Sequence, residues 1–162
     1  MPVVIRTRIT YTAPAEVSAR RLSRHVKAAL METGARWHHR MYGRHFEPFA
    51  PAKYGYAARS RSYREAKRAG LAPSGEDRPI VWTGRTEEDS TRAARVTGTS
   101  KHVRVHLTVP WYVTANIRRR VDVAAELVAW SRDEGNHLAR YLDARLQARL
   151  AADEGQLITI AV

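Results

Sequence analysis

The sequence predicts an α+β fold, in which two long amphipathic helices pack on a small antiparallel sheet. Apolar residues recur at helical spacing over residues 14–42 and 121–152, and they alternate with polar residues over 3–11 and 103–109. A helix with one apolar face needs a surface to cover, and antiparallel strands provide such a surface. The chain of 162 residues is about the size of one domain, so we expect a single domain over residues 1–162, in the order β-α-loop-α-β-β-α-β.

The first quarter of the chain predicts a strand and a long helix. Strict alternation over residues 3–11 indicates a half-buried strand. Pro14 suits the first turn of the helix that follows, and Gly43 is a natural stop. Gly34 falls inside this helix, at a cost of about 1 kcal/mol relative to alanine. We therefore expect one helix over residues 14–42.

Residues 43–60 are expected to form a long loop. The segment contains two prolines, two glycines and four aromatic residues, and it shows no regular period. Loops of this length are usually functional or disordered, and the aromatic residues argue against disorder. Short helical segments are predicted after it, over residues 61–69 and 86–91.

The second half of the chain predicts a hairpin followed by the second long helix. Apolar and polar residues alternate over 103–109, and the preceding segment 93–99 is placed to pair with this strand. The helix over residues 121–152 contains Gly135, where we expect a kink. Residues 156–162 predict a short apolar strand at the end of the chain.

Charge is the strongest feature of the composition. The chain carries 28 Lys and Arg against 16 Asp and Glu, a formal net charge of +12. The excess lies in residues 1–70, whose net charge is +11, whereas residues 71–162 carry +1. Such a surface attracts polyanions, so nucleic acid is the first partner to consider, and an acidic protein neighbour is the alternative.

The absence of cysteine and of long apolar runs excludes several classes of protein. A chain without cysteine has no disulfide scaffold, no thiolate catalysis and no cysteine-ligated metal site. No apolar run approaches the roughly 18 residues of a membrane span, and Arg6 and Arg8 interrupt the apolar start of the chain. We therefore expect no membrane partner and a protein kept in a cytoplasm-like space.

No motif in the chain predicts an active site, a cofactor site or a metal site. Glu65-Ala66-Lys67 is the E-x-K half of a common metal-dependent nuclease core, but that core also needs an upstream Asp, and none precedes Asp77. P-loop, GxGxxG, GxSxG and HExxH patterns are absent from the sequence. We expect a protein that is not an enzyme and that holds no cofactor.

Three histidines near the end of the first long helix are not placed to share a metal ion. His38 and His39 are adjacent, so on a helix they point about 100° apart. We expect these two side chains and His45 to be solvated or to face phosphate groups.

Aromatic and basic residues interleave in the loop and in the short helix that follows it. This composition suits a protein interface, packing of the loop against the sheet, or base stacking. We favour the interface because no RNA- or DNA-binding motif is present. The residues expected to contact a neighbouring subunit or partner are Phe46, Phe49, Tyr54, Tyr56, Arg59, Arg61, Tyr63, Lys67, Trp82, Trp111 and Tyr112. The residues expected to face DNA are Arg36, Arg40, Arg44, Lys53, Arg64 and Arg68.

The same region carries a resemblance to a known family. The run KYGYAARSRSYREAKRAG at residues 53–70, followed by PIVWTG at residues 79–84, resembles the neck and tail-completion proteins of tailed bacteriophages. Members of that group often carry an aromatic-rich loop, a Y-x-x-x-K stretch and a P-L-V-x-S/T-G turn. Here Tyr63 and Lys67 match the stretch, and the turn has Ile80 in place of the usual Leu.

The resemblance extends over roughly residues 36–135 and includes the order of the elements. A leading helix, the aromatic loop, a β-hairpin and a closing helix follow one another. The run VPWYV at residues 109–113 is similar to the segment that leaves the hairpin in such proteins. Acidic residues follow the turn here, at residues 87–89, where family members carry an apolar or basic position.

The resemblance implies a structural virion protein of the phage neck, a head–tail connector or tail-completion subunit assembled in the host cytoplasm. Its expected partners are further copies of itself in a closed ring (a hexamer or dodecamer), neighbouring portal, adaptor or tail-tube proteins, and the double-stranded DNA in the lumen. Strands at the two ends of the chain would pair between subunits of such a ring. The alternatives are a basic cytoplasmic nucleic-acid-binding module and, as the least favoured hypothesis, a metal-dependent nuclease.

Overall fold

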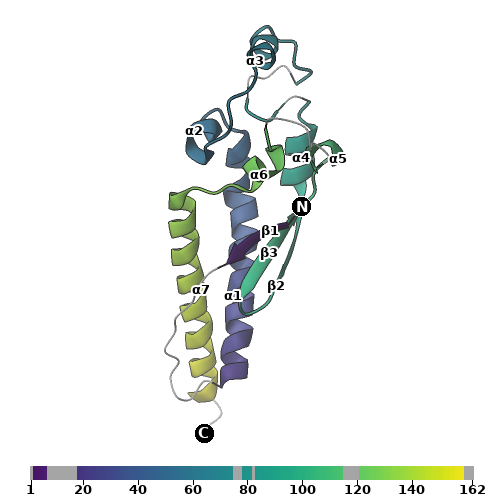
Figure 1. The fold of residues 1–162 in the computed structure, drawn as a ribbon. Coiled ribbons are helices and arrows are strands. Elements are labelled where there is room, and N and C mark those ends of the chain that lie inside the picture. Colours follow the sequence, from purple (N-terminus) through teal and green to yellow (C-terminus); the bar gives the residue numbers. More distant parts are fainter. Residues whose placement is uncertain (1, 7–17, 75–77, 82, 115–120, 159–162) are drawn as a thin grey trace.

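The computed structural model describes residues 2–6, 18–74, 78–81, 83–114 and 121–158. It has the predicted α+β architecture (Figure 1). Its largest elements are two long helices that lie side by side and a three-stranded sheet that packs on the first of them. The helices are α1 (Ala19–Arg40) and α7 (Arg132–Ile158), and the strands are β1 (Pro2–Arg6), β2 (Ala94–Gly98) and β3 (His102–Leu107). We call these five elements the stem.

The other helices are short and gather beyond the end of the stem at which α1 finishes and α7 begins (Figure 1). They are η1 (Tyr42–Phe46, a 3-10 helix), α2 (Ala50–Tyr54), α3 (Arg61–Arg68), α4 (Arg85–Arg92), α5 (Trp111–Thr114) and α6 (Val123–Val128). We call these helices and the segments between them the head end. Among the helices described, none has the length and apolar character needed to cross a membrane.

Helix α1 lies at the centre of the stem, between the sheet and α7. Ser18 caps its first turn by accepting a hydrogen bond from the backbone N–H of Arg21 (3.3 Å). The helix predicted over residues 14–42 is confirmed from Ala19 to Arg40, and residues 14–17 lie outside the described part of the chain. The buried residues of α1 are Val26, Ala29, Leu30, Thr33, Gly34, Trp37 and His38.

Gly34 is the point at which α1 comes closest to the sheet. A Cβ atom at this position would lie 2.9 Å from Val103 Cγ2, 3.2 Å from Val105 Cγ2 and 3.3 Å from Val96 Cγ1. Contacts of this length force a neighbouring group to move. Gly34 is therefore more than a residue that the helix tolerates. Its missing side chain allows α1 and the sheet to pack at this distance.

The sheet has the strand order β1-β3-β2, and both neighbouring pairs are antiparallel. The side chains of β3 alternate, with Val103, Val105 and Leu107 buried towards α1 and Arg104 exposed on the other face. This alternation confirms the predicted hairpin. The predicted first strand is confirmed over residues 3–6, whereas 7–11 lie outside the described residues.

The single helix predicted over residues 121–152 is in fact two helices, α6 and α7, separated by residues 129–131. The interruption lies before Gly135, where we expected a kink; that residue belongs to the first turn of α7. The break is set by a capping box: Glu134 N donates to Ser131 Oγ (3.3 Å), and Ser131 N donates to Glu134 Oε2 (3.4 Å). This exchange satisfies the first N–H groups of α7 and starts a new helix.

Helix α7 packs on α1 through leucines at four-residue spacing. The buried leucines are Leu138, Leu142, Leu146 and Leu150. The helix continues to Ile158, so the strand expected over 156–162 is wrong for residues 156–158, and 159–162 lie outside the described residues. Extending an existing helix adds one hydrogen bond per residue, which favours continuation over a new strand.

The loop expected over residues 43–60 is wrong in part, because η1 and α2 form within it. Pro51 lies in the first turn of α2, where its fixed φ suits a helix and its missing N–H is no loss. Gly55 ends α2 in the left-handed conformation, with φ of 67°. The helices predicted over residues 61–69 and 86–91 are confirmed by α3 and α4.

Candidate interaction surfaces

A stack of aromatic rings forms the buried centre of the head end. The His45 ring lies parallel to the Tyr54 ring, with 4.1 Å between their centroids. His45 Nδ1 lies 2.6 Å from Tyr56 Oη, and the Tyr56 hydroxyl donates to the carbonyl oxygen of His45 (3.1 Å). Phe46 and Tyr42 are fully buried beside these rings. Burial lowers the pKa of His45 to about 4, so its imidazole is neutral at pH 7.

Glu134 ties this stack to the start of α7. Its side chain is only 2% exposed, and it accepts hydrogen bonds from Lys53 Nζ (2.8 Å) and Tyr54 Oη (2.6 Å). A buried carboxylate costs free energy unless it is paired and hydrogen-bonded, and here it is both. Burial, with the Glu134 charge beside it, raises the pKa of Tyr54, so this hydroxyl stays a hydrogen-bond donor.

Glu126 makes the corresponding attachment from α6. Its two carboxylate oxygens accept hydrogen bonds from Arg59 (2.9 and 2.5 Å), and one of them also accepts from Ala57 N (2.9 Å). The hydrogen bond to this carboxylate raises the pKa of Arg59. Helix α2 is therefore held to α7 by the Lys53–Glu134 ion pair, and the segment after α2 is held to α6 by the Arg59–Glu126 ion pair.

Internal packing accounts for four residues that the sequence assigned to a partner interface. Phe46 is fully buried, so its ring has no surface to offer a partner, and for this residue the interface prediction is wrong. Tyr54, Tyr56 and Arg59 are half-buried, and their polar groups bond to other residues of the head end. These side chains pack on η1, α6 and α7, and not on the sheet as the packing alternative expected.

Lys67 and Glu65 lie on different sides of α3. Lys67 is buried, contrary to the interface prediction, and its Nζ donates to the carbonyl oxygen of Arg78. Glu65 is exposed and pairs with Arg61, which is itself exposed (Nε to Oε1, 2.7 Å). The two polar groups of the E-x-K run therefore do not converge on one site.

Large hydrophobic side chains are exposed at the head end. Two of them were predicted to contact partners: Trp111 is 77% exposed and Phe49 is 50% exposed. Two were not singled out by the sequence: Leu71 is 70% exposed and Trp130 is 43% exposed. The segments that carry all four belong to the head end in Figure 1.

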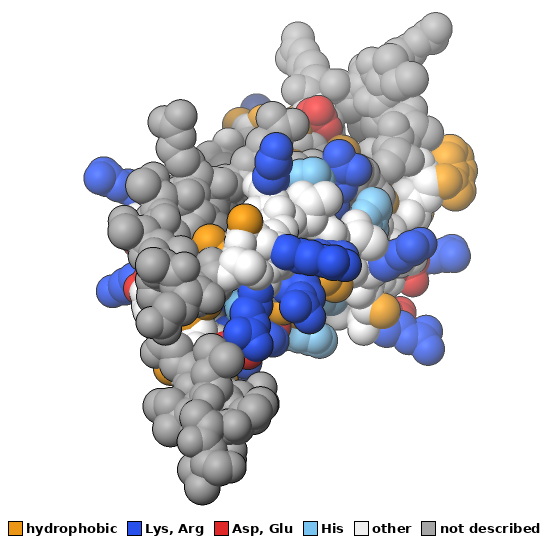
Figure 2. Space-filling model, turned by 90° about the horizontal axis from the view of Figure 1, so that it is seen from below, with side chains coloured by type: hydrophobic (Ala, Val, Ile, Leu, Met, Phe, Trp, Pro, Cys, Tyr) orange, Lys and Arg blue, Asp and Glu red, His pale blue; other side chains and the backbone are white. Residues whose placement is uncertain are grey.

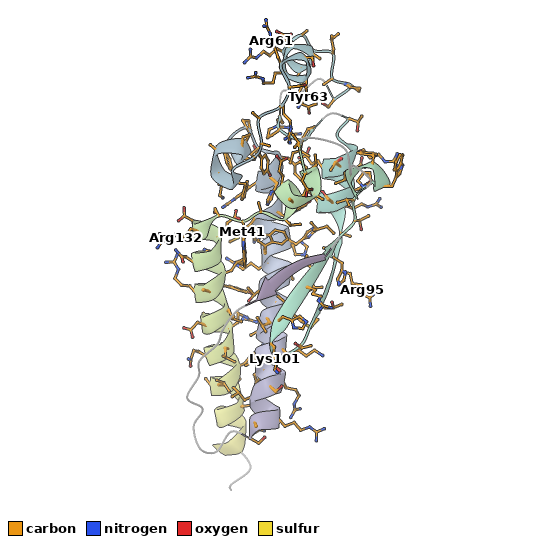
Figure 3. The ribbon with its side chains drawn as sticks, in the orientation of Figure 1. Met41, Arg61, Tyr63, Arg95, Lys101 and Arg132 are labelled. Atoms are coloured by element: carbon orange, nitrogen blue, oxygen red, sulfur yellow. The ribbon has the colours of Figure 1, made fainter. Side chains whose placement is uncertain are left out.

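The remaining predicted interface residues have mixed surroundings. Tyr63 and Tyr112 are half-buried, and the hydroxyl of Tyr112 lies 3.1 Å from Thr86 Oγ1. Tyr63 and Arg61 both belong to α3, and Figure 3 labels them on opposite sides of that helix. Trp82 lies outside the described residues.

The residues predicted to face DNA divide into two groups. Arg40, Arg44, Arg64 and Arg68 are exposed. Arg36 is instead a packing residue, with its guanidinium carbon 4.4 Å from the centroid of the Tyr141 ring and Nε donating to His137 Nε2 (3.4 Å). Lys53 is bound to the buried carboxylate of Glu134. For Arg36 and Lys53, contacts with α7 replace the expected DNA-facing position.

The histidines at the end of α1 are not all solvated. His38 is buried, and its Nε2 lies 2.8 Å from the carbonyl oxygen of Ser90 in α4. His45 is fully buried, and only His39 is exposed, so the expectation of solvated rings is wrong for the first two. Within the ranges that the structure describes, no group of three or more His, Asp or Glu side chains is placed to hold a metal ion.

The sheet presents a cationic face that the sequence did not single out. We call it the outer face, formed by the residues of β2 and β3 that point away from α1 and by the turn between the strands. Its residues are Arg95, Thr97, Lys101, His102, Arg104 and His106. Figure 3 shows the labelled Arg95 and Lys101 on the sheet, with Arg95 projecting away from α1.

Comparisons with known proteins gave no match. No family model, no curated protein and no solved structure is similar enough to this chain to suggest a relative. The residues and contacts described above are therefore the basis for the function proposed below.

Proposed function

We propose that the protein is a structural subunit of a tailed-phage virion: a neck, head–tail connector or tail-completion protein that forms a homo-oligomeric ring around the DNA exit channel. The observation that carries the proposal is the exposed hydrophobic side chains of the head end, namely Phe49, Leu71, Trp111 and Trp130. A lone subunit would leave these four large side chains in water, and a neighbouring subunit that buried them would gain about 25 cal/mol for each Å² of apolar surface covered. Tryptophan is also among the residues that contribute most to interface binding energy.

The residues of the family resemblance meet at the head end, which supports the proposal. Lys67, from the Y-x-x-x-K stretch, donates to the carbonyl oxygen of Arg78, immediately before the turn that begins at Pro79. Ile80 and Val81 of that turn are buried, and Ile80 has a φ of 63°, which is costly for a β-branched residue. Such a turn persists only where the surrounding packing holds it. The two matched motifs therefore form one packed unit.

The edges of the sheet offer a second route to assembly. Strands β1 and β2 form the two edges, and an edge strand pairs readily with another chain. In a closed ring, each subunit could contribute one edge to each neighbour. Residues 156–158 of the strand expected over 156–162 are helical, so the edges that the described chain offers are those of β1 and β2.

The mass of the purified chain in solution tests the proposal. We expect light scattering to give a multiple of 18.4 kDa that grows with concentration, and negative-stain images to show rings. Trp111→Ser and Leu71→Ser should each lower the oligomer fraction without lowering the melting temperature, because both side chains are largely exposed. Gln147→Ser, on the exposed side of α7, is the matched control and should assemble as the wild type does.

A monomer at every concentration, which also fails to associate with portal, adaptor or tail-tube proteins, would overturn the ring proposal. A monomer that binds duplex DNA with steep salt dependence would instead favour the nucleic-acid-binding module. That second function has its own supporting observation, the cationic outer face of the sheet.

A further inference from the structure

The outer face of the sheet carries exposed cations. In the part of the chain that the structure describes, α1 is the only helix with substantial contact to β2 and β3, and it lies against the opposite face. Arg95, Lys101 and Arg104 are exposed. None of these three cations is paired with a described carboxylate, whereas Lys53 and Arg59 at the head end are.

Strand register brings the outer-face groups together. Arg95 lies opposite His106, and Thr97 lies opposite Arg104, in the β2–β3 pair. Arg95 and Arg104 are therefore diagonal neighbours, about 7–8 Å apart at their backbone positions. Two like charges at this separation repel each other unless an anion lies between or above them. The sheet thus holds its cations at a spacing that favours a bound anion.

The two imidazoles on this face are oriented by threonines. His106 Nε2 lies 3.1 Å from Thr97 Oγ1, and His102 Nδ1 lies 3.3 Å from Thr99 Oγ1. The face therefore presents guanidinium, ammonium, imidazole and hydroxyl groups on a rigid strand pair. These are the side chains that contact phosphate oxygens in protein–DNA complexes.

A second set of exposed cations lies on the first turns of α1. Arg20, Arg24 and Lys27 are exposed and lie at three- and four-residue spacing, one turn before Met31, which lies against Gly98 at the end of β2. Figure 2, seen from the end of the stem at which α1 begins, shows Lys and Arg side chains gathered with few acidic side chains between them.

We propose that the outer face binds the sugar–phosphate backbone of duplex DNA, through Arg95, Lys101 and Arg104, without reading sequence. This inference deepens the proposed function, because it names the surface of the subunit that meets the DNA. A protein partner fits less well, since protein interfaces have an apolar centre, whereas the side chains that β2 and β3 place on this face are cationic, imidazole or hydroxyl groups. Single-stranded nucleic acid also fits less well, because β2 and β3 place no Phe, Tyr or Trp side chain on this face for bases to stack on.

Binding of a fluorescent duplex of random sequence, measured by anisotropy across a salt series, tests the inference. The full chain is compared with the triple variant Arg95→Gln, Lys101→Gln, Arg104→Gln. We expect the triple variant to bind at least about tenfold more weakly at low salt. The slope of log K against log salt should fall by about 2–3, since each neutralised phosphate contributes about 0.9.

The control removes the same charge from the region that the sequence predicted to face DNA. The variant Arg44→Gln, Arg64→Gln, Arg68→Gln changes three exposed cations of the head end, so its net charge equals that of the first variant. We expect its affinity to fall less than threefold and its salt slope to stay near the wild-type value. Equal losses in the two variants would mean that net charge alone attracts DNA, and would overturn the proposal.

Two further outcomes would overturn the inference. One is wild-type protein that fails to bind the duplex at low salt. The other is poly-glutamate that displaces the duplex at equal charge concentration, because the face would then serve an acidic protein as well as DNA. Light scattering on the same samples separates this inference from the ring proposal. The Arg95, Lys101 and Arg104 triple variant should have the same mass in solution as the wild type. If the wild type is a monomer and only this triple variant loses DNA binding, the ring proposal fails and the assignment of the outer face stands.

Discussion

The stem and the head end are held together by different chemistry. In the stem, α1 packs on the sheet and on α7 mainly through apolar side chains such as Leu30, Val105 and Leu142. At the head end and at the start of α7, buried polar groups also take part: Glu134 pairs with Lys53 of α2, and His45 Nδ1 lies against Tyr56 Oη. Apolar packing is non-directional and tolerates substitutions of similar volume, whereas a buried charge depends on one partner in one geometry. The stability of the head end should therefore depend on individual polar residues, and the stability of the stem on how closely its apolar side chains pack.

Removal of the Glu134 carboxylate gives the largest expected effect. Glu134→Ala leaves Lys53 Nζ and Tyr54 Oη without their shared acceptor, and it breaks the capping box with Ser131. Breaking a buried ion pair costs about 3–5 kcal/mol. We expect a loss of about 3 kcal/mol in the free energy of unfolding, because Lys53 is partly exposed and can turn towards water. Urea denaturation followed by circular dichroism measures this loss.

Glu65→Ala is the matched control for this change. Glu65 also pairs with a cation, Arg61, but both side chains are exposed on α3. An exposed pair at this spacing contributes about 0.3–0.5 kcal/mol, so the control should cost no more than that. If Glu134→Ala and Glu65→Ala lowered the free energy of unfolding by similar amounts, burial would add nothing to the Lys53–Glu134 pair. The proposed difference between the head end and the stem would then be wrong.

Acidification gives the second largest effect, through His45. Burial lowers the pKa of this imidazole from 6.5 to about 4 in the folded protein. The unfolded chain therefore binds the proton first, so the stability is fully present above pH 6.5 and is lost as the pH falls towards 4. Between pH 6.5 and pH 5 we expect a loss of about 2 kcal/mol in the free energy of unfolding. Urea denaturation at a series of pH values in this window measures it.

Two substitutions separate His45 from the other titrating groups. His45→Phe fills a similar volume and should flatten the pH dependence over this window, whatever its effect on stability at pH 7. His39→Phe changes an exposed histidine and should keep the wild-type slope. An unchanged slope in His45→Phe would show that another group governs the loss at low pH.

The stem could be predicted from the sequence because its pattern is local. Apolar residues at helical or alternating spacing place α1, the hairpin and most of α7, and the buried leucines of α7 follow that spacing. Even the error at residues 129–131 had a local signal, since Ser131 and Glu134 form an S-x-x-E capping box. That signal is specific for a helix start, and it outweighs the glycine at position 135.

The head end could not be predicted because its contacts are not local. Lys53 and Glu134 are 81 residues apart, and nothing in the sequence near either residue indicates that they meet. Burial likewise decides which aromatic side chains are available to a partner, so Phe46 and Trp111 look alike in the sequence and differ in the structure. The outer-face residues of β3 form the polar half of an alternating strand, but which face of the sheet α1 packs against cannot be read from that alternation.

The smallest expected effect tests the shape of the stem. Gly34→Ala places a Cβ 2.9 Å from Val103 Cγ2, and the valines it meets are stiff at χ1 because they are β-branched. Overpacking of this kind costs about 1–3 kcal/mol, and the better helix propensity of alanine returns about 1 kcal/mol. We expect a net loss of about 1 kcal/mol in the free energy of unfolding, measured by urea denaturation.

Gly135→Ala is also a glycine-to-alanine substitution in a helix, but we expect it to change the free energy of unfolding in the opposite direction. A Cβ at Gly135 meets nothing within 4 Å, and the residue lies in α7, so only the helix propensity changes. We expect this variant to be more stable by about 0.5–1 kcal/mol. The difference between the two glycine variants measures how closely α1 and the sheet must approach. If Gly34→Ala were also stabilising, the valines would have room to move, and the stem would be held by apolar area rather than by close packing at that residue.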